Sequence, residues 1–476
     1  MANPPRTHSK YLLYWMQQAQ RATYNPALDY ACAQAEALSL PLIVVFVLSP
    51  QVPEANLRHY SFMLQGLLET AATLHKQGIS LFLAYGNPPE IIAQLASEAV
   101  ELIADHGYLR YQREWREMLQ IMLKDSRTIY TEIETEPLIP VAVVSDHEEY
   151  AAATIRRKLL RKIGSDFSFK PKRHYLLPAF RHDAPGFQAL HRFDPEKPQL
   201  TEIWWNNQLQ TDDGVPAVKN MKAGHTEALR LLNTFLKNKL PLYATQRNEP
   251  SLDIQSGLSP YLHFGQICTM EIIQRLSEHI GLNISELPEL IISKEDRDPV
   301  LMGARAFAEE LVIRRELSFN YCWYNEAYDS FAGLPAWAKS TLLNHLSDPR
   351  EQHYLLDSLE QCATHDVYWN AAQWEMMTTG KMHNYLRMYW GKRVLAWCDN
   401  PEDAYQILLY LNNRYSLDGR DPNSFAGIAW CFGKHDRPWQ NRSIYGSVRY
   451  MNARGLERKF DMKGYLSRIG YPEQGV

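Results

Sequence analysis

Two domains of different class are predicted from the sequence: an α/β domain with a parallel, Rossmann-like sheet, and a larger all-α domain. In residues 11–140, short apolar runs alternate with helical patterns, which is typical of βαβ units. From Gly224 onward the pattern is almost wholly helical. A chain of 476 residues also exceeds one ordinary core. We therefore expect an α/β domain over 1–160, a connector over 161–220 and a helical domain over 221–476.

The first domain contains four apolar runs that are candidate strands: Tyr11–Trp15, 41–48, 79–85 and 100–104. The run 41–48 is unbroken, which is typical of a strand buried on both faces. Helical patterns separate the runs, at Pro26–Leu38, 60–77 and 89–98. Neither G-x-G-x-x-G nor G-x-x-x-x-G-K-[ST] occurs, so an ordinary dinucleotide site and a P-loop are not indicated.

A basic cluster marks the end of this domain: Arg156, Arg157, Lys158, Arg161 and Lys162. Such a cluster is compatible with a solvated helix face or with a nucleic-acid contact. The following residues, 170–216, are rich in Pro, His, Phe and Asp and form the expected connector.

Composition excludes several classes of protein. The net charge of −4 argues against a uniformly basic surface, although a local basic face remains compatible with it. The six cysteines are scattered without a C-x-x-C pair, so we expect no metal site, no disulfide framework and a reducing compartment. Neither a signal peptide nor an apolar run of membrane-spanning length is present, so we expect a cytoplasmic protein, associated with the nucleoid in a prokaryote.

The helical domain has periodic patterns at 226–237, 261–278, 300–324, 337–345 and 399–412. Before the second of these, residues 255–266 read Q-S-G-L-S-P-Y-L-H-F-G-Q. Ser259 followed by Pro260 predicts a helix start with a hydroxyl cap. A helix start beside small residues can hold an anion such as a diphosphate, but a plain capped helix explains the pattern as well.

Glu310 and Arg314 are four residues apart on a predicted helix, so they are expected to pair, either on the surface or in a cavity wall. A second set, Gly380, Asn384, Arg387, Met388 and Gly391, is expected on one helical stripe, with Asp418 as the partner of Arg387. Either a flat ligand or the packing of another helix would explain small residues at both ends of that stripe.

Aromatic residues concentrate in 368–439, interleaved with Arg, Asn, Asp and Met, which is unusual for a packed core. Trp390 and Trp397 are seven residues apart and share nearly one face of a helix. This row of aromatic side chains is compatible with ordinary core packing and also with a route for the transfer of single electrons. His263, His383 and His435 lack the spacing of metal ligands, so we expect them to be structural or loop residues.

Seven motifs along the chain carry a family resemblance: Y-W-M-Q-Q-A-Q-R at 14–21, S-G-L-S-P-Y-L-H-F-G-Q at 256–266, E-E-L-V-I-R-R-E-L at 309–317, W-N-A-A-Q at 369–373, G-K-M-H-N-Y-L-R-M-Y-W at 380–390, L-D-G-R-D-P-N at 417–423 and H-D-R-P-W at 435–439. With them the chain resembles the photolyase/cryptochrome superfamily, and within it the class II cyclobutane pyrimidine dimer photolyases, over nearly its whole length.

The resemblance implies a helical domain that binds FAD. The residues it assigns to the diphosphate are Tyr243, Gln255, Ser256, Gly257, Leu258 and Ser259. Those it assigns to the flavin ring and its surroundings are Asn384, Arg387, Asn412, Asp418 and Gly419. An antenna chromophore is implied for the N-terminal domain, and we expect a deazaflavin of the 8-HDF type rather than a folate.

The resemblance also implies light-dependent repair, in which reduced FAD donates an electron to a flipped-out pyrimidine dimer and splits it. Glu310, Met388 and Trp430 are expected to face the dimer. Trp390 and Trp369 are expected to carry electrons to the flavin, with Tyr389 and Trp397 as side branches. Arg437 and Arg449 are expected to contact the double-stranded DNA that contains the dimer, and we expect a monomer.

The main alternative is a cryptochrome, a blue-light receptor without repair activity. Such proteins usually carry an extension beyond the helical domain, and the sequence ends at Val476, soon after the last motif. We therefore expect a photolyase rather than a cryptochrome.

Overall fold

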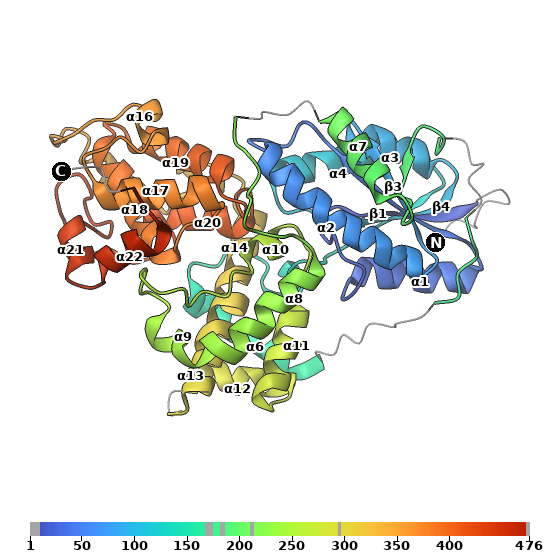
Figure 1. Ribbon diagram of the computed structural model, residues 1–476, viewed down its shortest axis with the longest axis horizontal. Helices are drawn as coiled ribbons and strands as arrows, with labels where there is room; N and C mark the ends of the chain where they lie inside the picture. Colours follow the sequence, from blue (N-terminus) through green and yellow to red (C-terminus); the bar gives the residue numbers. More distant parts are fainter. Residues whose placement is uncertain (1–9, 167–174, 181–185, 210–213, 294–296, 473–476) are drawn as a thin grey trace.

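The computed structural model describes residues 10–166, 175–180, 186–209, 214–293 and 297–472. An α/β domain and a larger helical domain lie side by side, as Figure 1 shows with the sheet at the right. This confirms the predicted fold class. In the described part of the chain, every helix is too short or too polar to cross a membrane.

The sheet has the strand order β5-β4-β1-β2-β3-β6, and its first five strands in sequence pair in parallel. The strands are β1 (Tyr11–Trp15), β2 (Leu42–Leu48), β3 (Ser80–Tyr85), β4 (Ala99–Asp105), β5 (Ile129–Ile133) and β6 (His191–Arg192). All four predicted strands are confirmed. The sequence did not reveal β5, because its residues are half exposed at the sheet edge and carry little apolar signal.

Helices cover both faces of this sheet: α1 (Pro26–Leu38), α2 (Leu57–Lys76), α3 (Pro88–Ala96) and α4 (Arg110–Met122). Alternate residues of β1 divide between two cores. Leu12 and Tyr14 pack with α1 and α2, whereas Leu13 and Trp15 pack with α3 and α4. A parallel sheet buried on both faces explains the unbroken apolar run of β2.

The segment that connects the two domains contacts both of them. Helix α6 (Ala152–Asp166) lies beside α12 (Leu287–Ile292) of the helical domain, as both ribbon views show. Strand β6 then pairs antiparallel with β3, and α7 (Pro198–Gln208) packs on α2 through the buried Trp205. The basic cluster is partly used on α6: Arg156 bonds Glu309, and Lys158 bonds Glu149 at 2.5 Å.

The remaining helices belong mainly to the second domain: α5 (Val141–Val144), α8 (His225–Thr234), α9 (Leu240–Gln246), α10 (Ser259–His263), α11 (Thr269–Ile280), α13 (Pro299–Ala308), α14 (Arg315–Tyr324), α15 (Ala336–Leu343), α16 (Leu356–Glu360), α17 (Val367–Thr379), α18 (Asn384–Trp397), α19 (Pro401–Tyr415), α20 (Pro422–Cys431), α21 (Ala453–Glu457) and α22 (Met462–Ile469). Short 3-10 turns lie at Ile284–Glu286 and Phe331–Gly333, and π-helical turns at Phe235–Lys239 and Glu309–Arg314.

The single helix predicted over 261–278 is wrong, because α10 ends at His263 and α11 begins at Thr269. Gly265 lies in the break with a φ of +62°. A Cβ on this residue would be 1.7 Å from the carbonyl oxygen of Gln18 in the other domain. The helix is therefore interrupted where the backbones of the two domains meet.

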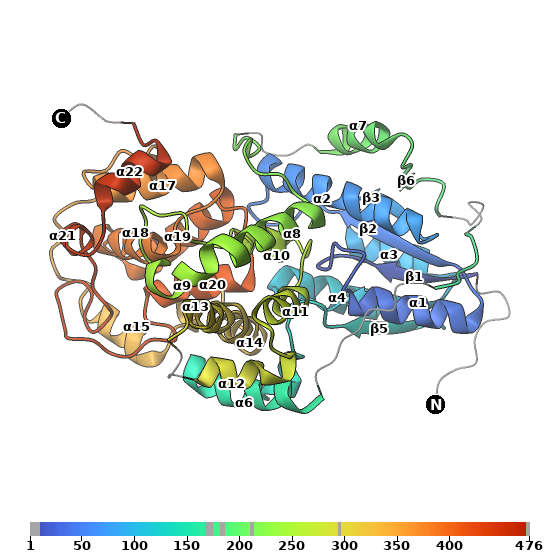
Figure 2. The ribbon, with the colours of Figure 1, turned by 60° about the horizontal axis from the view of Figure 1, so that its bottom comes forward.

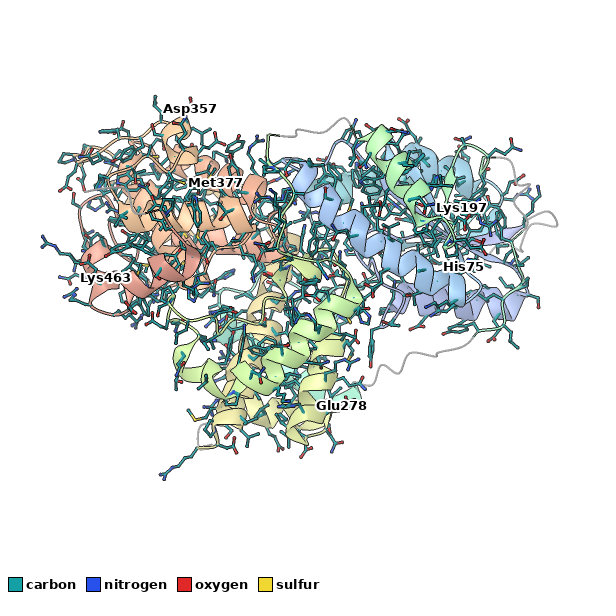
Figure 3. The ribbon with its side chains drawn as sticks, viewed as in Figure 1. His75, Lys197, Glu278, Asp357, Met377 and Lys463 are labelled. Carbon is teal, nitrogen blue, oxygen red and sulfur yellow. The ribbon has the colours of Figure 1, made fainter. Side chains whose placement is uncertain are left out.

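A buried arginine at the start of α2 ties the domains together. The Arg58 guanidinium donates to the carbonyl oxygens of Met376 and Met377 at the end of α17, and of Tyr415 at the end of α19. Figure 3 labels Met377 on α17. The last carbonyl groups of a helix lack partners within the helix, so this one side chain satisfies two helix ends at once.

Candidate active site

The helical domain contains a cavity of about 520 Å³, here called the site cavity. Residues of the α9–α10 region, the π-helical turn, the start of α18, the loop before α20 and α20 itself form its wall. Eleven of the residues that sequence analysis assigned to a site line it: Tyr243, Gln255, Ser256, Gly257, Leu258, Ser259, Glu310, Asn384, Arg387, Asp418 and Trp430. Segments far apart in sequence therefore meet at one place.

The loop 255–259 forms one wall, but its helix start differs from the prediction. Leu258, not Ser259, is the N-cap residue, and α10 has only five residues. The Ser259 hydroxyl instead helps to lower the pKa of Asp418. Gly257 has a φ of +75°, and a Cβ there would lie 3.5 Å from Lys381 Nζ. Burial lowers the pKa of Lys381, which lines the cavity beside this loop.

Arg387 and Asp418 pair at the cavity wall, with 3.6 Å between Nη2 and Oδ1. Arg387 also donates to Asn412 Oδ1, and Asn412 Nδ2 donates to Ser424 Oγ. Although burial opposes it, Arg387 and hydrogen bonds from Ser416 and Ser259 hold the pKa of Asp418 below its ordinary value. Asp418 is therefore ionised near neutral pH and fixes the guanidinium beside the cavity.

The predicted stripe through both glycines is wrong. Gly380 ends α17 in the left-handed conformation, before α18 begins at Asn384. Gly391 lies against α20, since a Cβ there would be 2.5 Å from Cys431 Sγ. Gly391 therefore allows α18 and α20 to pack closely. Gly419 is also tightly packed against its surroundings, because an added Cβ would be 2.8 Å from the Asn412 carbonyl oxygen.

Glu310 and Arg314 do not pair as expected, because residues 309–314 form a π-helical turn with a changed spacing. Glu310 Oε1 instead accepts a hydrogen bond of 2.8 Å from Arg247. Arg314 lies over the ring of Trp430 at 5.2 Å and 3.6 Å from Glu309. Arg314 thus lines the cavity beside Trp430, which is one of the two placements expected for it, but Glu310 is not its partner.

Met388 is half-buried and does not belong to the lining of the cavity. Its sulfur atom lies 3.9 Å from Cys431 Sγ, one residue beyond Trp430. The cavity wall also holds buried polar atoms without a hydrogen-bond partner in the described part of the chain: Arg314 Nε, His383 Nε2, Trp430 Nε1 and His435 Nε2. A large ligand with polar edges fits such a wall, because unmet buried polar groups are costly.

Three tryptophans of α17 and α18 are buried in contact with one another. The rings of Trp369 and Trp390 are nearly parallel, with 6.4 Å between centroids and 10° between planes. Trp397 meets Trp369 edge-on at 5.4 Å. Trp390 Nε1 donates to Gln373 Oε1 at 2.9 Å, which fixes the ring. Tyr389 is directed elsewhere, since its hydroxyl donates to Asp366.

Arg437 and Arg449 both lie beside Trp439, which is 40% exposed. Their guanidinium carbons are 5.6 Å and 4.4 Å from its ring. Arg449 also lies 3.7 Å from Asp436. The loop that holds Arg437 continues directly from His435 in the cavity wall, so the two arginines are expected near the cavity mouth.

A second, smaller cavity of about 120 Å³ lies between the domains. Several aromatic side chains lie in its wall, among them Phe46, Tyr60, Tyr111 and Phe264, together with polar residues such as Gln112. Asp421 lines both cavities and lies 3.4 Å from His263. This interdomain cavity was not visible in the sequence, because its lining comes from short segments of both domains.

Comparisons with solved structures define the class of the fold. A class III photolyase from Agrobacterium tumefaciens superposes with a TM-score of 0.71 at 17% identity, over 97% of this chain and 86% of that one. A cryptochrome from Synechocystis also gives a TM-score of 0.71, at 16% identity, over 97% and 89%. The fold is that of the photolyase/cryptochrome superfamily, and at these identities it does not separate its members.

Sequence relatives separate the photolyases from the cryptochromes in this case. The DNA photolyase family model matches residues 12–173. A deoxyribodipyrimidine photo-lyase from Methanothermobacter thermautotrophicus is 41% identical over 469 residues, which are 98% of this chain and 96% of that protein. Another from Potorous tridactylus is 36% identical over 467 residues, 97% of this chain and 81% of that protein. The chain belongs to the DNA photolyase family.

Proposed function

We propose that this protein is a light-dependent DNA repair enzyme that splits cyclobutane pyrimidine dimers with reduced FAD as its cofactor, and that it belongs to class II. The observation that carries the proposal is the site cavity, where the Arg387–Asp418 pair, the 255–259 loop and Trp430 meet in a chain that is 41% identical to a deoxyribodipyrimidine photo-lyase. The buried polar atoms without partners in the described wall support a ligand of this kind.

The residues of the wall have distinct roles in this proposal. The loop 255–259, with Tyr243 and Lys381 beside it, holds the diphosphate of FAD. Arg387 and Asn412 lie at the flavin ring, where the guanidinium stabilises negative charge and Asp418 keeps it in place. When bound, FAD supplies light-driven transfer of one electron to the dimer and takes it back after the ring splits.

The dimer enters from DNA as a flipped-out pair of bases. A fused pyrimidine pair stacks and pairs poorly, so its extrusion costs less than that of normal bases. Trp430 supplies an aromatic wall that excludes water, and Met388 supports that wall beside Cys431. Glu310 accepts a hydrogen bond from the pyrimidine edge, while Arg437 and Arg449 contact the DNA at the cavity mouth.

Trp390 and Trp369 form the route by which electrons reach the flavin, and Trp397 is a side branch that contacts Trp369. Their buried, contacting rings support this role. Tyr389, whose hydroxyl is bound to Asp366, is a side branch at most.

We propose that the interdomain cavity holds the antenna chromophore, a deazaflavin of the 8-HDF type rather than a folate. The aromatic lining supports a flat ligand, and Asp421 connects this cavity to the site cavity. Reconstitution with 8-HDF should give a new band in the excitation spectrum for repair. A protein that binds a folate instead, or transfers no excitation, would overturn this assignment.

Repair itself is tested with a duplex that contains one thymine dimer. Under blue light, with the flavin reduced beforehand, we expect loss of the dimer and none in the dark. Flavin binding without light-dependent repair would favour a cryptochrome, and a purified protein without flavin absorption would contradict both functions. Light scattering of the same sample tests the expected monomer.

A further inference from the structure

His435 lies in the wall of the site cavity together with Glu310, Arg314 and Trp430. It lies in the loop after α20 and shortly before Arg437, so it stands between the cavity and the proposed DNA contacts. Its spacing from other histidines gave no sign of a ligand-binding role. In the structure, its imidazole ring packs edge-on against the ring of Tyr321, with 5.7 Å between the ring centroids.

The hydrogen bonds of His435 fix its tautomer. Nδ1 lies 2.9 Å from the carbonyl oxygen of Tyr150, which can only accept a hydrogen bond. Nδ1 therefore carries the proton and donates, and Nε2 of the neutral ring keeps a lone pair. Burial lowers the pKa of His435 to about 4, and the nearby charges of Lys434 and Arg314 act in the same direction. The ring is thus neutral under physiological conditions, with Nε2 as an acceptor.

That acceptor is buried and has no hydrogen-bond partner among the described residues. Leaving a buried acceptor unsatisfied costs about 1–3 kcal/mol, so a donor from a ligand would be favourable there. Glu310 is a second acceptor in the same wall, with Oε1 already held by Arg247.

The backbone holds the ring in this place. His435 has a φ of 59°, in the left-handed region that costs an ordinary residue about 1–2 kcal/mol. Contacts on both sides maintain it. The Lys434 ammonium bonds Glu148 and the Gly333 carbonyl oxygen, and the Tyr150 hydroxyl donates to the Asp436 carbonyl oxygen at 3.1 Å. The acceptor is therefore positioned before any ligand binds.

We propose that His435 Nε2 accepts a hydrogen bond from the N3–H of one pyrimidine of the dimer, while Glu310 accepts from the N3–H of the other. This inference rests on the proposed function. Each thymine of a dimer keeps an N3–H between two carbonyl groups, whereas cytosine has no hydrogen at N3 in its ordinary form. Two acceptors in the wall thus select a dimer of two thymines, and His435 determines the preference at one of the two positions.

Binding in the dark tests this role without the chemistry. Anisotropy gives the Kd of duplexes with a thymine dimer, unmodified or methylated at N3 of one thymine or the other. Wild-type protein should bind either methylated duplex about tenfold more weakly. His435→Asn should bind the unmodified dimer about tenfold more weakly and lose its sensitivity to methylation at one thymine only. Asparagine suits this position, because it tolerates a left-handed backbone and its shorter amide does not reach as Nε2 does.

Wild-type affinity in His435→Asn, or the same penalty for each methyl group in both proteins, would overturn the role of His435. Flavin content and the thermal midpoint show whether the variant is folded. If it is not, His435→Gly takes its place under the same two criteria, because glycine tolerates the left-handed backbone and has no acceptor in its side chain. Wild-type protein that does not prefer the dimer to undamaged duplex would overturn the proposed function itself, whereas a preference without the methylation pattern would overturn only the inference about His435.

Discussion

Trp390 shows how much one side chain contributes at the residue scale. Its ring is fully buried, stacks on Trp369 and donates to Gln373. Trp390→Phe should abolish photoreduction of oxidised flavin, because the first ring of the electron route is replaced by one that is harder to oxidise. Repair should survive when the flavin is reduced chemically beforehand. Absorption under illumination and a repair assay measure the two activities separately.

Trp374→Phe is the matched control for that variant. Trp374 lies on the same helix as Trp369, but its ring contacts Tyr471 at 5.9 Å instead of the tryptophan stack. Photoreduction should therefore be retained. Equal loss of photoreduction and repair in Trp390→Phe would mean that Trp390 is needed only for structure.

Lys392 makes the stability of the protein depend on pH. It is fully buried on α18 and donates to the Cys431 carbonyl oxygen at the end of α20. Burial lowers its pKa from 10.5 to about 8, opposed by Cys431 and Asp436 and reinforced by Arg449. Between these two values the unfolded chain binds a proton that the folded chain lacks, so this group makes stability rise with pH by roughly 1 kcal/mol per unit.

Lys392→Met should remove this contribution. Unfolding in urea at pH 8 and pH 9 gives the free energy of unfolding of both proteins. The increase between the two pH values should be smaller in the variant by roughly 1 kcal/mol. Lys463→Met, on the far end of the helical domain in Figure 3, should behave like the wild type. A variant slope equal to that of the wild type would contradict the assignment.

At the scale of single elements, the interruption between α10 and α11 has a measurable cost. Gly265→Ala would place a Cβ 1.7 Å from the Gln18 carbonyl oxygen. Gly281→Ala is its matched control, because Gly281 has a φ of +72° with no atom within 4 Å of the added Cβ. The control should lose about 1 kcal/mol of stability from the backbone alone. Gly265→Ala should lose a further 1–3 kcal/mol or so, because the domains must separate.

Thermal unfolding of the two variants measures this difference. Similar midpoints for both variants would show that the contact between Gly265 and Gln18 can adjust without loss of stability. In that case the left-handed backbone, and not the approach of Gln18, would explain why glycine stands in the break.

Elements with strong local signals could be predicted from the sequence, and those set by distant contacts could not. The run of β2 and the helix Pro26–Leu38 were recognisable from apolar periodicity alone. The interruption between α10 and α11 at Gly265 depends on Gln18, which lies in the other domain. Similarly, the spacing of Glu310 and Arg314 predicted a pair, but a π-helical turn and Arg247 determined the observed one.

The candidate site followed the same rule. Arg387 and Asp418 were expected to pair because motif and charge agreed, and they lie 3.6 Å apart. His435 gave no such signal, and Arg314 was expected to pair with Glu310 rather than to lie beside Trp430. The place of His435 in the wall depends on the hydrogen bond that its Nδ1 donates to the Tyr150 carbonyl oxygen, and that of Arg314 on the ring of Trp430. No spacing in the sequence expresses either contact.

At the scale of the whole molecule, DNA binding must overcome a net charge of −4. Arg437 and Arg449 bracket an exposed Trp439, so the attraction is local. We expect the affinity for dimer-containing duplex to fall as salt increases, because bound cations are released from the phosphates. Alanine at either position should reduce the slope of log K against log salt by about 1.

Arg230→Ala is a suitable control, because Arg230 pairs with Glu227 on α8, in another helix of the same domain. Its slope should match that of the wild type. Affinity that does not change with salt would contradict a phosphate contact at Arg437 and Arg449.

The buried Arg58 has a consequence for how the protein can change over evolutionary time. One residue of the α/β domain completes the ends of two helices, one carrying Trp369 and the other Asn412. A descendant protein without the proposed antenna chromophore would still need this domain to hold α17 and α19 of its helical domain in place. We therefore expect descendants to retain the α/β domain whether or not they retain the proposed chromophore.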